Sequence, residues 1–105
     1  KVQLGIKTGG GKACPQTATL STWIFTNKPG KVKFIIRKAG GGKTKPITVN
    51  AVKGANGVFM ATFQQTITVH QSINTKYMVE ETKFGKISPW VPLNVKCLTS
   101  GGIGN

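Results

Sequence analysis

Hydrophobic and polar residues alternate in short runs along the chain, and turn residues separate the runs at intervals of roughly 8–12 residues. The runs are rich in Val, Ile, Thr and Phe, and no stretch has the period of an amphipathic helix. Alternation with a period of two places successive side chains on opposite faces of a strand. The pattern therefore predicts seven strands, over residues 2–8, 17–26, 31–38, 45–53, 58–69, 76–83 and 88–97.

The segments between these runs carry residues that favour turns, because Gly reaches positive φ and Pro fixes φ. The predicted turns are Gly9–Gly11, Asn27–Gly30, Gly40–Gly42, Gly54–Gly57, Gln71–Asn74 and Phe84–Gly85.

Each predicted strand has one apolar face. The inward sets are Ala18, Leu20, Thr22, Ile24 and Thr26; Val32, Phe34 and Ile36; Phe59, Ala61, Phe63, Gln65, Ile67 and Val69; and Val91, Leu93, Val95 and Cys97. One apolar face per strand predicts two antiparallel sheets that pack face to face. We expect one domain over residues 1–97, followed by a flexible tail over 98–105.

A single domain suits the length of 105 residues, of which 38% are hydrophobic. No run of about 18 apolar residues occurs, so the sequence predicts no membrane-spanning helix.

Cys14 and Cys97 are the two cysteines, and their spacing suits neither a CxxC redox motif nor a zinc site. The sequence predicts a disulfide between them; the alternative is two free thiols buried as small hydrophobic groups. A disulfide indicates an oxidising compartment, so we expect an extracytoplasmic protein, periplasmic or secreted after removal of a signal peptide. A chain that had been shortened artificially would also begin without Met.

Charge is concentrated in the first half of the chain. Fifteen Lys and Arg residues against two acids give a formal net charge of +13, and residues 1–54 supply +11 of it. Seven of the 18 residues from 28 to 45 are basic, namely Lys28, Lys31, Lys33, Arg37, Lys38, Lys43 and Lys45. The alternation predicts a basic sheet face that could bind a polyanion. The alternative is a solvated outer strand whose lysines prevent edge pairing.

All cations but Arg37 are lysines, which favour diffuse charge attraction over bidentate recognition, so sequence-specific DNA binding is not expected. Trp23 and Phe25 share the outer face of the preceding strand. This aromatic pair could form a stacking platform beside the basic residues, or it could be covered by the N-terminal segment or by a neighbouring domain.

Residues for acid–base chemistry are scarce. Asp is absent, and the neighbours Glu80 and Glu81 point to opposite faces of a strand, so they cannot act as a carboxylate pair. His70 is the only histidine, and we expect it to be a solvent-exposed residue at a strand end. Gly40–Thr44 fails the phosphate-loop pattern, because Arg37 stands where Gly is required and a strand follows. The sequence therefore predicts no enzyme, no metal site and no cofactor.

Two segments carry a resemblance to a known family. The first contains Cys14-Pro15, Ala18-Thr19-Leu20, Ile24, Thr26-Asn27, Pro29-Gly30, Val32 and Phe34, and the second is Ser88-Pro89-Trp90-Val91-Pro92-Leu93-Asn94-Val95. Together they resemble small immunoglobulin-like β-sandwich domains of uncharacterised secreted bacterial proteins, although Ile36 stands where that pattern has Trp. The resemblance implies an all-β, antiparallel two-sheet Ig-like sandwich of about seven strands, exported and without catalytic residues.

Three functions are compatible with this sequence. The first is a non-enzymatic exported binding module whose basic face binds an anionic envelope polymer or an acidic partner. The second is a structural or assembly domain that associates through sheet edges or the apolar patch of Trp23 and Phe25. The third is a basic nucleic-acid-binding β-barrel.

Overall fold

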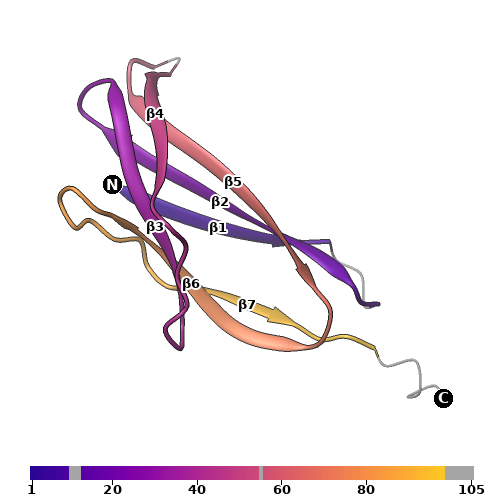
Figure 1. Cartoon of the computed structure of the whole chain (residues 1–105). Coiled ribbons are helices and arrows are strands. Elements are labelled where there is room, and N and C mark those ends of the chain that lie inside the picture. The colour runs from indigo at the N-terminus through magenta and orange to yellow at the C-terminus, as the bar shows by residue number, and fades with distance from the viewer. Residues whose placement is uncertain (10–12, 55, 99–105) are drawn as a thin grey trace.

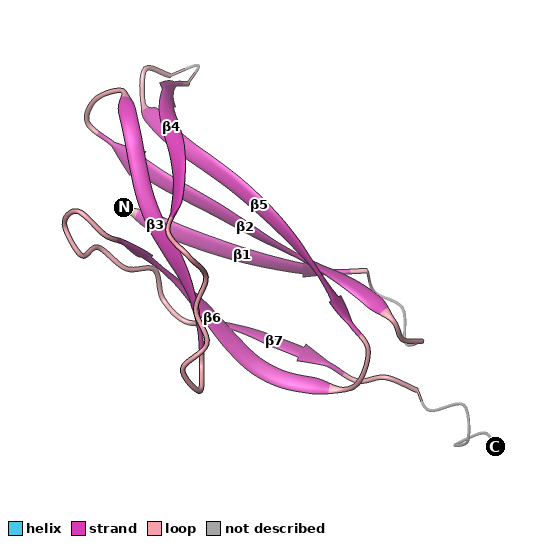
Figure 2. Cartoon of the chain, in the orientation of Figure 1, coloured by secondary structure: helices cyan, strands magenta, loops and turns pink. Residues whose placement is uncertain are grey.

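The computed structural model describes residues 1–9, 13–54 and 56–98 (Figure 1). These ranges contain strands and loops without helices (Figure 2). The seven strands are β1 (Val2–Thr8), β2 (Gln16–Thr26), β3 (Gly30–Lys38), β4 (Ile47–Lys53), β5 (Phe59–Val69), β6 (Ile73–Glu81) and β7 (Val91–Val95). No helix that could cross a membrane is present in the described part of the chain.

All strand pairs are antiparallel, and the strands form one sheet in the order β1-β2-β5-β4-β3-β6-β7. Strand β4 joins the two halves, because Ile47–Ala51 pair with β3 whereas Val52 and Lys53 pair with β5. The sheet curls until β1 lies against β6 and β7, which gives a nearly closed barrel (Figure 1).

The two sheets expected from the sequence are here continuous through β4. A barrel and a sandwich both need one apolar face on every strand. Alternation therefore does not distinguish a barrel from a sandwich. The all-β class, the antiparallel pairing and the number of strands in the described ranges are as predicted.

The strand bounds follow the predictions closely, except near the C-terminus. Strand β1 covers the predicted residues, but β6 begins at Ile73, inside the predicted turn Gln71–Asn74. Ile73 and Asn74 pair with Val95 and Asn94 instead, so the turn is shorter than predicted. Strand β7 is shorter than the predicted 88–97. Residues 10 and 11 of the first predicted turn, 55 of the fourth and 99–105 of the predicted tail lie outside the described residues.

The interior follows the predicted faces. The larger core cluster contains the inward residues of six strands, namely Val2, Leu20, Ile24, Val32, Phe34, Ile36, Ala51, Ala61 and Val79. A second cluster contains Ala18, Val69, Leu93 and Val95. The second cluster lies toward the end of the barrel where β2 begins and β7 ends.

The predicted disulfide is present at that same end. Cys14 precedes β2 and Cys97 follows β7, and their Cα atoms are 5.4 Å apart. Ala13 and Leu98 form an isolated parallel bridge beside it. The disulfide therefore ties the segment between β1 and β2 to the end of the last strand.

Candidate functional site

A cleft of about 900 Å³ opens at the end of the barrel opposite the disulfide. Its walls are the start of β1, the end of β2, the start of β3 and the loop 82–86 between β6 and β7. The cleft exists because β3 pairs with β6 only from Phe34 onward, where Phe34 is opposite Glu81. Residues 30–33 therefore lack a strand partner on that side, and the sheet opens.

The floor of the cleft is the apolar end of the main core. Val2, Ile24 and Val32 line it with 5%, 2% and 8% of their surfaces exposed. Nearer the mouth lie Pro29 and Phe84, and 73% of the surface of Phe84 is exposed to solvent. The cleft thus has an apolar interior and one large apolar side chain standing at its edge.

Lysines surround the mouth. Six exposed lysines line the cleft, and we call them the rim lysines: Lys1, Lys28, Lys31, Lys33, Lys83 and Lys86. Within the described ranges no rim lysine has an ion pair, since Arg37 and Glu80 form the one salt bridge there. Clustered cations without counterions raise the local positive potential, which attracts anions.

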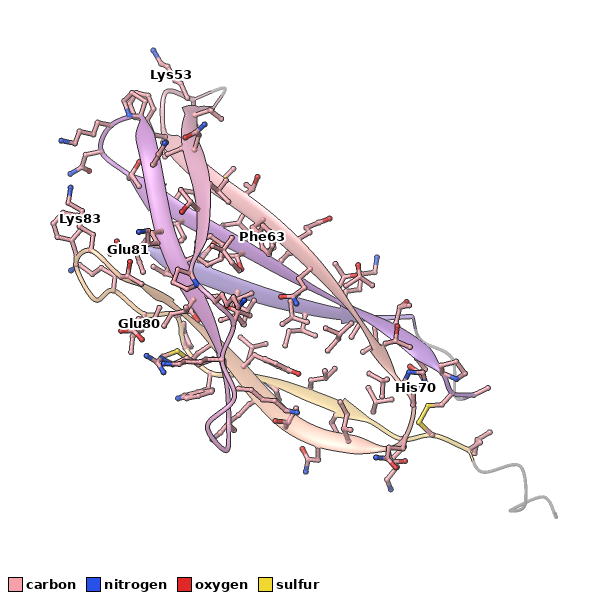
Figure 3. The ribbon with its side chains drawn as sticks, viewed as in Figure 1. Lys53, Phe63, His70, Glu80, Glu81 and Lys83 are labelled. Atoms are coloured by element: carbon pink, nitrogen blue, oxygen red, sulfur yellow. A yellow bond between two sulfur atoms is a disulfide. The ribbon has the colours of Figure 1, made fainter. Side chains whose placement is uncertain are left out.

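The acidic residue of the cleft is Glu81, and its carboxylate is already engaged. Oε2 accepts a hydrogen bond from the backbone N–H of Lys83 at 2.7 Å, and Oε1 accepts one from Phe84 at 2.9 Å. These bonds compensate the burial of the carboxylate, since Glu81 is only 7% exposed. Figure 3 shows Glu81 and Lys83 where the β6–β7 loop faces β3.

The β6–β7 loop is fixed in place by further hydrogen bonds. The backbone N–H of Thr82 donates to the Lys33 carbonyl at 3.0 Å, and that of Glu81 donates to the Lys86 carbonyl at 2.8 Å. Gly85 adopts a φ of 72°, a conformation that favours glycine. The loop therefore holds Lys83, Phe84 and Lys86 at the mouth of the cleft.

The seven basic residues predicted between 28 and 45 do not form one cluster. Lys28, Lys31 and Lys33 line the cleft. Arg37 Nε donates to Glu80 Oε1 at 2.6 Å on the outer face of the sheet. At about 3.3 Å per residue, strand β3 places its two ends about 26 Å apart.

The remaining three predicted residues, Lys38, Lys43 and Lys45, lie at the far end of β3 and in the hairpin that follows it. Strand β3 lies between β4 and β6, but residues 30–33 have no strand partner on the β6 side, so the alternative of a solvated strand edge stays a prediction for Lys31 and Lys33.

Three rim lysines were not predicted. Lys83 and Lys86 belong to the less basic half of the chain, and Lys1 is far from the basic run in sequence. The position of Lys83 and Lys86 follows from the opposition of Phe34 and Glu81, two residues separated by 47 positions, and that of Lys1 follows from the pairing of Val2 with Ile24. No pattern within a single sequence indicates that register.

The predicted aromatic patch is divided. Phe25 lines the cleft, whereas Trp23 packs across Gly5 of β1, where an added Cβ would lie 3.2 Å from Trp23 Cζ3. Trp23 is half-buried by this contact. Strand β1 therefore lies against part of the Trp23 ring.

The other candidate residues contribute no second site. His70 is exposed after the end of β5, as predicted (Figure 3). Within residues 1–9, 13–54 and 56–98, no group of three His, Cys, Asp or Glu side chains could hold a metal ion. Glu80 and Glu81 point to opposite faces, also as predicted.

Comparison with known proteins adds no relative: no protein-family model, no curated protein and no solved structure matches this chain.

Proposed function

We propose that this chain is a non-enzymatic binding module that holds an anionic polymer against the rim lysines. The observation that carries the proposal is the convergence of six exposed lysines, from three separate segments, on one cleft. Among the described residues that line the cleft, Glu81 has the one carboxylate, and backbone N–H groups rather than lysines bind it, so the rim lysines have no ion-pair partner there. Lysines suit a polymer with repeated phosphates or carboxylates, because each acts as a point charge without demanding bidentate geometry.

The disulfide bears on which kind of polymer is proposed as the partner. A disulfide is compatible with an oxidising, extracytoplasmic location. We therefore propose a phosphate-bearing or acidic polymer of the cell envelope as the partner. The immunoglobulin-like relationship and export remain predictions of the sequence, and the proposed binding does not depend on them.

The test compares two variants of equal charge. The rim variant is Lys28→Gln/Lys83→Gln/Lys86→Gln, and the hairpin variant is Lys38→Gln/Lys43→Gln/Lys45→Gln; each lowers the net charge of +13 by three. Binding to fluorescently labelled inorganic polyphosphate is measured by anisotropy at two salt concentrations. All six lysines are exposed, so both variants should fold as the wild type does.

We expect the rim variant to lose about tenfold in affinity, equivalent to about 1.4 kcal/mol, and the hairpin variant to lose less than about threefold. Wild-type affinity should fall as salt rises, because binding releases counterions. Equal losses in the two variants would show charge attraction without a site, and absence of binding would refute the proposal. Tighter binding of a single-stranded oligonucleotide than of polyphosphate would favour the nucleic-acid alternative.

A second candidate function, assembly through sheet edges, is favoured by one observation. Strands β1 and β7 each pair on one side only, with β2 and β6. Unpaired edges can add a strand from another chain, although Pro92 weakens this in β7. Association that increases with protein concentration and persists in high salt would support this function, and a monomer at all concentrations would contradict it.

A further inference from the structure

The interior of the cleft is apolar, whereas its rim is positively charged. Polymer phosphates need cations, yet behind the lysines the cleft is lined by Val2, Ile24 and Val32. Val2, Ile24 and Val32 are themselves nearly buried, so the apolar surface that a polymer would leave in contact with water is mainly that of the more exposed lining residues Phe25, Pro29 and Phe84. A ligand with both an acidic group and an apolar chain would match both parts.

Phe84 strengthens this reading. It is the most exposed of the large hydrophobic side chains in the described ranges, and it stands beside the cleft. Glu81 binds the Phe84 backbone N–H at 2.9 Å, so the ring is presented on a fixed turn rather than on a free loop. The Lys83 Nζ lies 5.3 Å from the centre of the same ring. A cation and an aromatic ring are thus held together at the point where a headgroup would meet its chain.

The size of the cleft is also suitable. Small-molecule sites commonly measure about 300–1,000 Å³ and combine apolar walls with a few polar groups, and this cleft of about 900 Å³ lies in that range. From this combination, and resting on the proposed anion binding, we infer that the cleft binds a single anionic amphiphile. Its phosphate or carboxylate headgroup lies at the rim lysines, and its alkyl chain lies against Phe25, Pro29 and Phe84, above the apolar floor.

The test uses alkyl phosphates of increasing chain length, namely hexyl, octyl and decyl phosphate, each below its critical micelle concentration. Affinities are measured by isothermal titration calorimetry, with inorganic phosphate as the chainless reference. Burial of each methylene is expected to strengthen binding by about two- to fourfold. Vesicles of an anionic phospholipid form a separate arm, which distinguishes a captured monomer from adsorption to a membrane surface.

Variants separate the two parts of the cleft. Phe84→Ser should flatten the dependence on chain length and should lower polyphosphate affinity by less than the rim variant does, because it removes no charge. Leu98→Ser is the matched control, because Leu98 is 65% exposed but lies beside the disulfide at the other end. The rim variant should weaken all three alkyl phosphates by a similar factor and keep the chain-length dependence.

The outcomes distinguish the two proposals. If polyphosphate binds but affinity does not rise with chain length, the amphiphile inference is wrong and the polyanion function stands. Binding to vesicles without binding to monomers also overturns the inference. If neither polyphosphate nor alkyl phosphates bind, both proposals fail.

Discussion

Thr22 is a polar residue in the core whose hydroxyl has no hydrogen-bond partner. It is 1% exposed and points inward from the middle of β2. An unsatisfied buried hydroxyl costs about 1–3 kcal/mol, and Val has nearly the same shape and a high strand propensity. We expect Thr22→Val to raise the free energy of unfolding by about 1 kcal/mol in urea denaturation.

Thr66→Val is the control for that substitution. Thr66 is exposed on the neighbouring strand β5, where its hydroxyl can bond to water. The control should change stability by less than about 0.5 kcal/mol. A loss of stability in Thr22→Val would mean that the hydroxyl has a partner in solution.

Burial of Tyr77 makes the stability of the protein depend on pH in the alkaline range. Desolvation by burial raises the pKa of Tyr77 above 10.0, because the phenolate is the charged form. A raised pKa in the folded state stabilises the fold below pH 10.0, and this contribution is lost as the pH rises through the folded-state pKa. The free energy of unfolding of the wild type should therefore fall more steeply above pH 10.0 than that of Tyr77→Phe.

The same group can be titrated directly, because Tyr77 is the only tyrosine. The near-ultraviolet absorbance of the phenolate should show a higher midpoint in the native protein than in denaturant. Equal midpoints would contradict the burial argument.

At the scale of elements, Glu81 determines the shape of the β6–β7 loop. In Glu81→Gln one carboxylate oxygen becomes an NH₂ group, which cannot accept the N–H bond of Lys83 or Phe84 that the oxygen accepts now. We expect a loss of about 1–3 kcal/mol in the free energy of unfolding, with faster hydrogen exchange at these two amides.

Glu80→Gln provides a matched control next to it. Glu80 forms a partly exposed ion pair with Arg37 on the outer face, and such pairs contribute about 0–1 kcal/mol. The amides of the loop should keep their exchange rates in this control. Equal effects of the two substitutions would show that Glu81 acts only through its charge.

Strands and their inward faces were the most predictable part of this protein. Alternation identifies Leu20, Ile24 and Phe34 as buried, because the two faces of a strand meet different surroundings. The start of β6 was missed because Ser72 and Asn74 are turn-forming residues, yet pairing of Asn74 with Asn94 overrides that preference. Trp23 illustrates a related limit, since its packing depends on a glycine in another strand.

For the whole molecule, the arrangement of the strands was not predictable, and the candidate site depends on it. Strand β2 is followed in the sheet by β5, and β3 is followed by β6, so neighbours are distant in sequence. The basic run predicted half of the rim lysines, namely Lys28, Lys31 and Lys33. The positions of the other three rim lysines and of the apolar floor depend on which strands pair with one another. Hydrophobic alternation alone allows several partners for each strand.

The disulfide and the cleft lie at opposite ends of the barrel, so stability and binding should be separable. Cys14 and Cys97 close a loop with a sequence separation of 83, for which the chain-entropy model gives about 4–5 kcal/mol as an upper figure. Cys14→Ser/Cys97→Ser should therefore lower the free energy of unfolding by up to this amount. Because distant sites act nearly independently, the folded variant should bind polyphosphate with wild-type affinity, measured at low temperature in the same anisotropy assay. Weaker binding by a fully folded variant would instead show that the Cys14–Cys97 disulfide controls how wide the cleft is. The disulfide would then act through the curvature of the whole sheet.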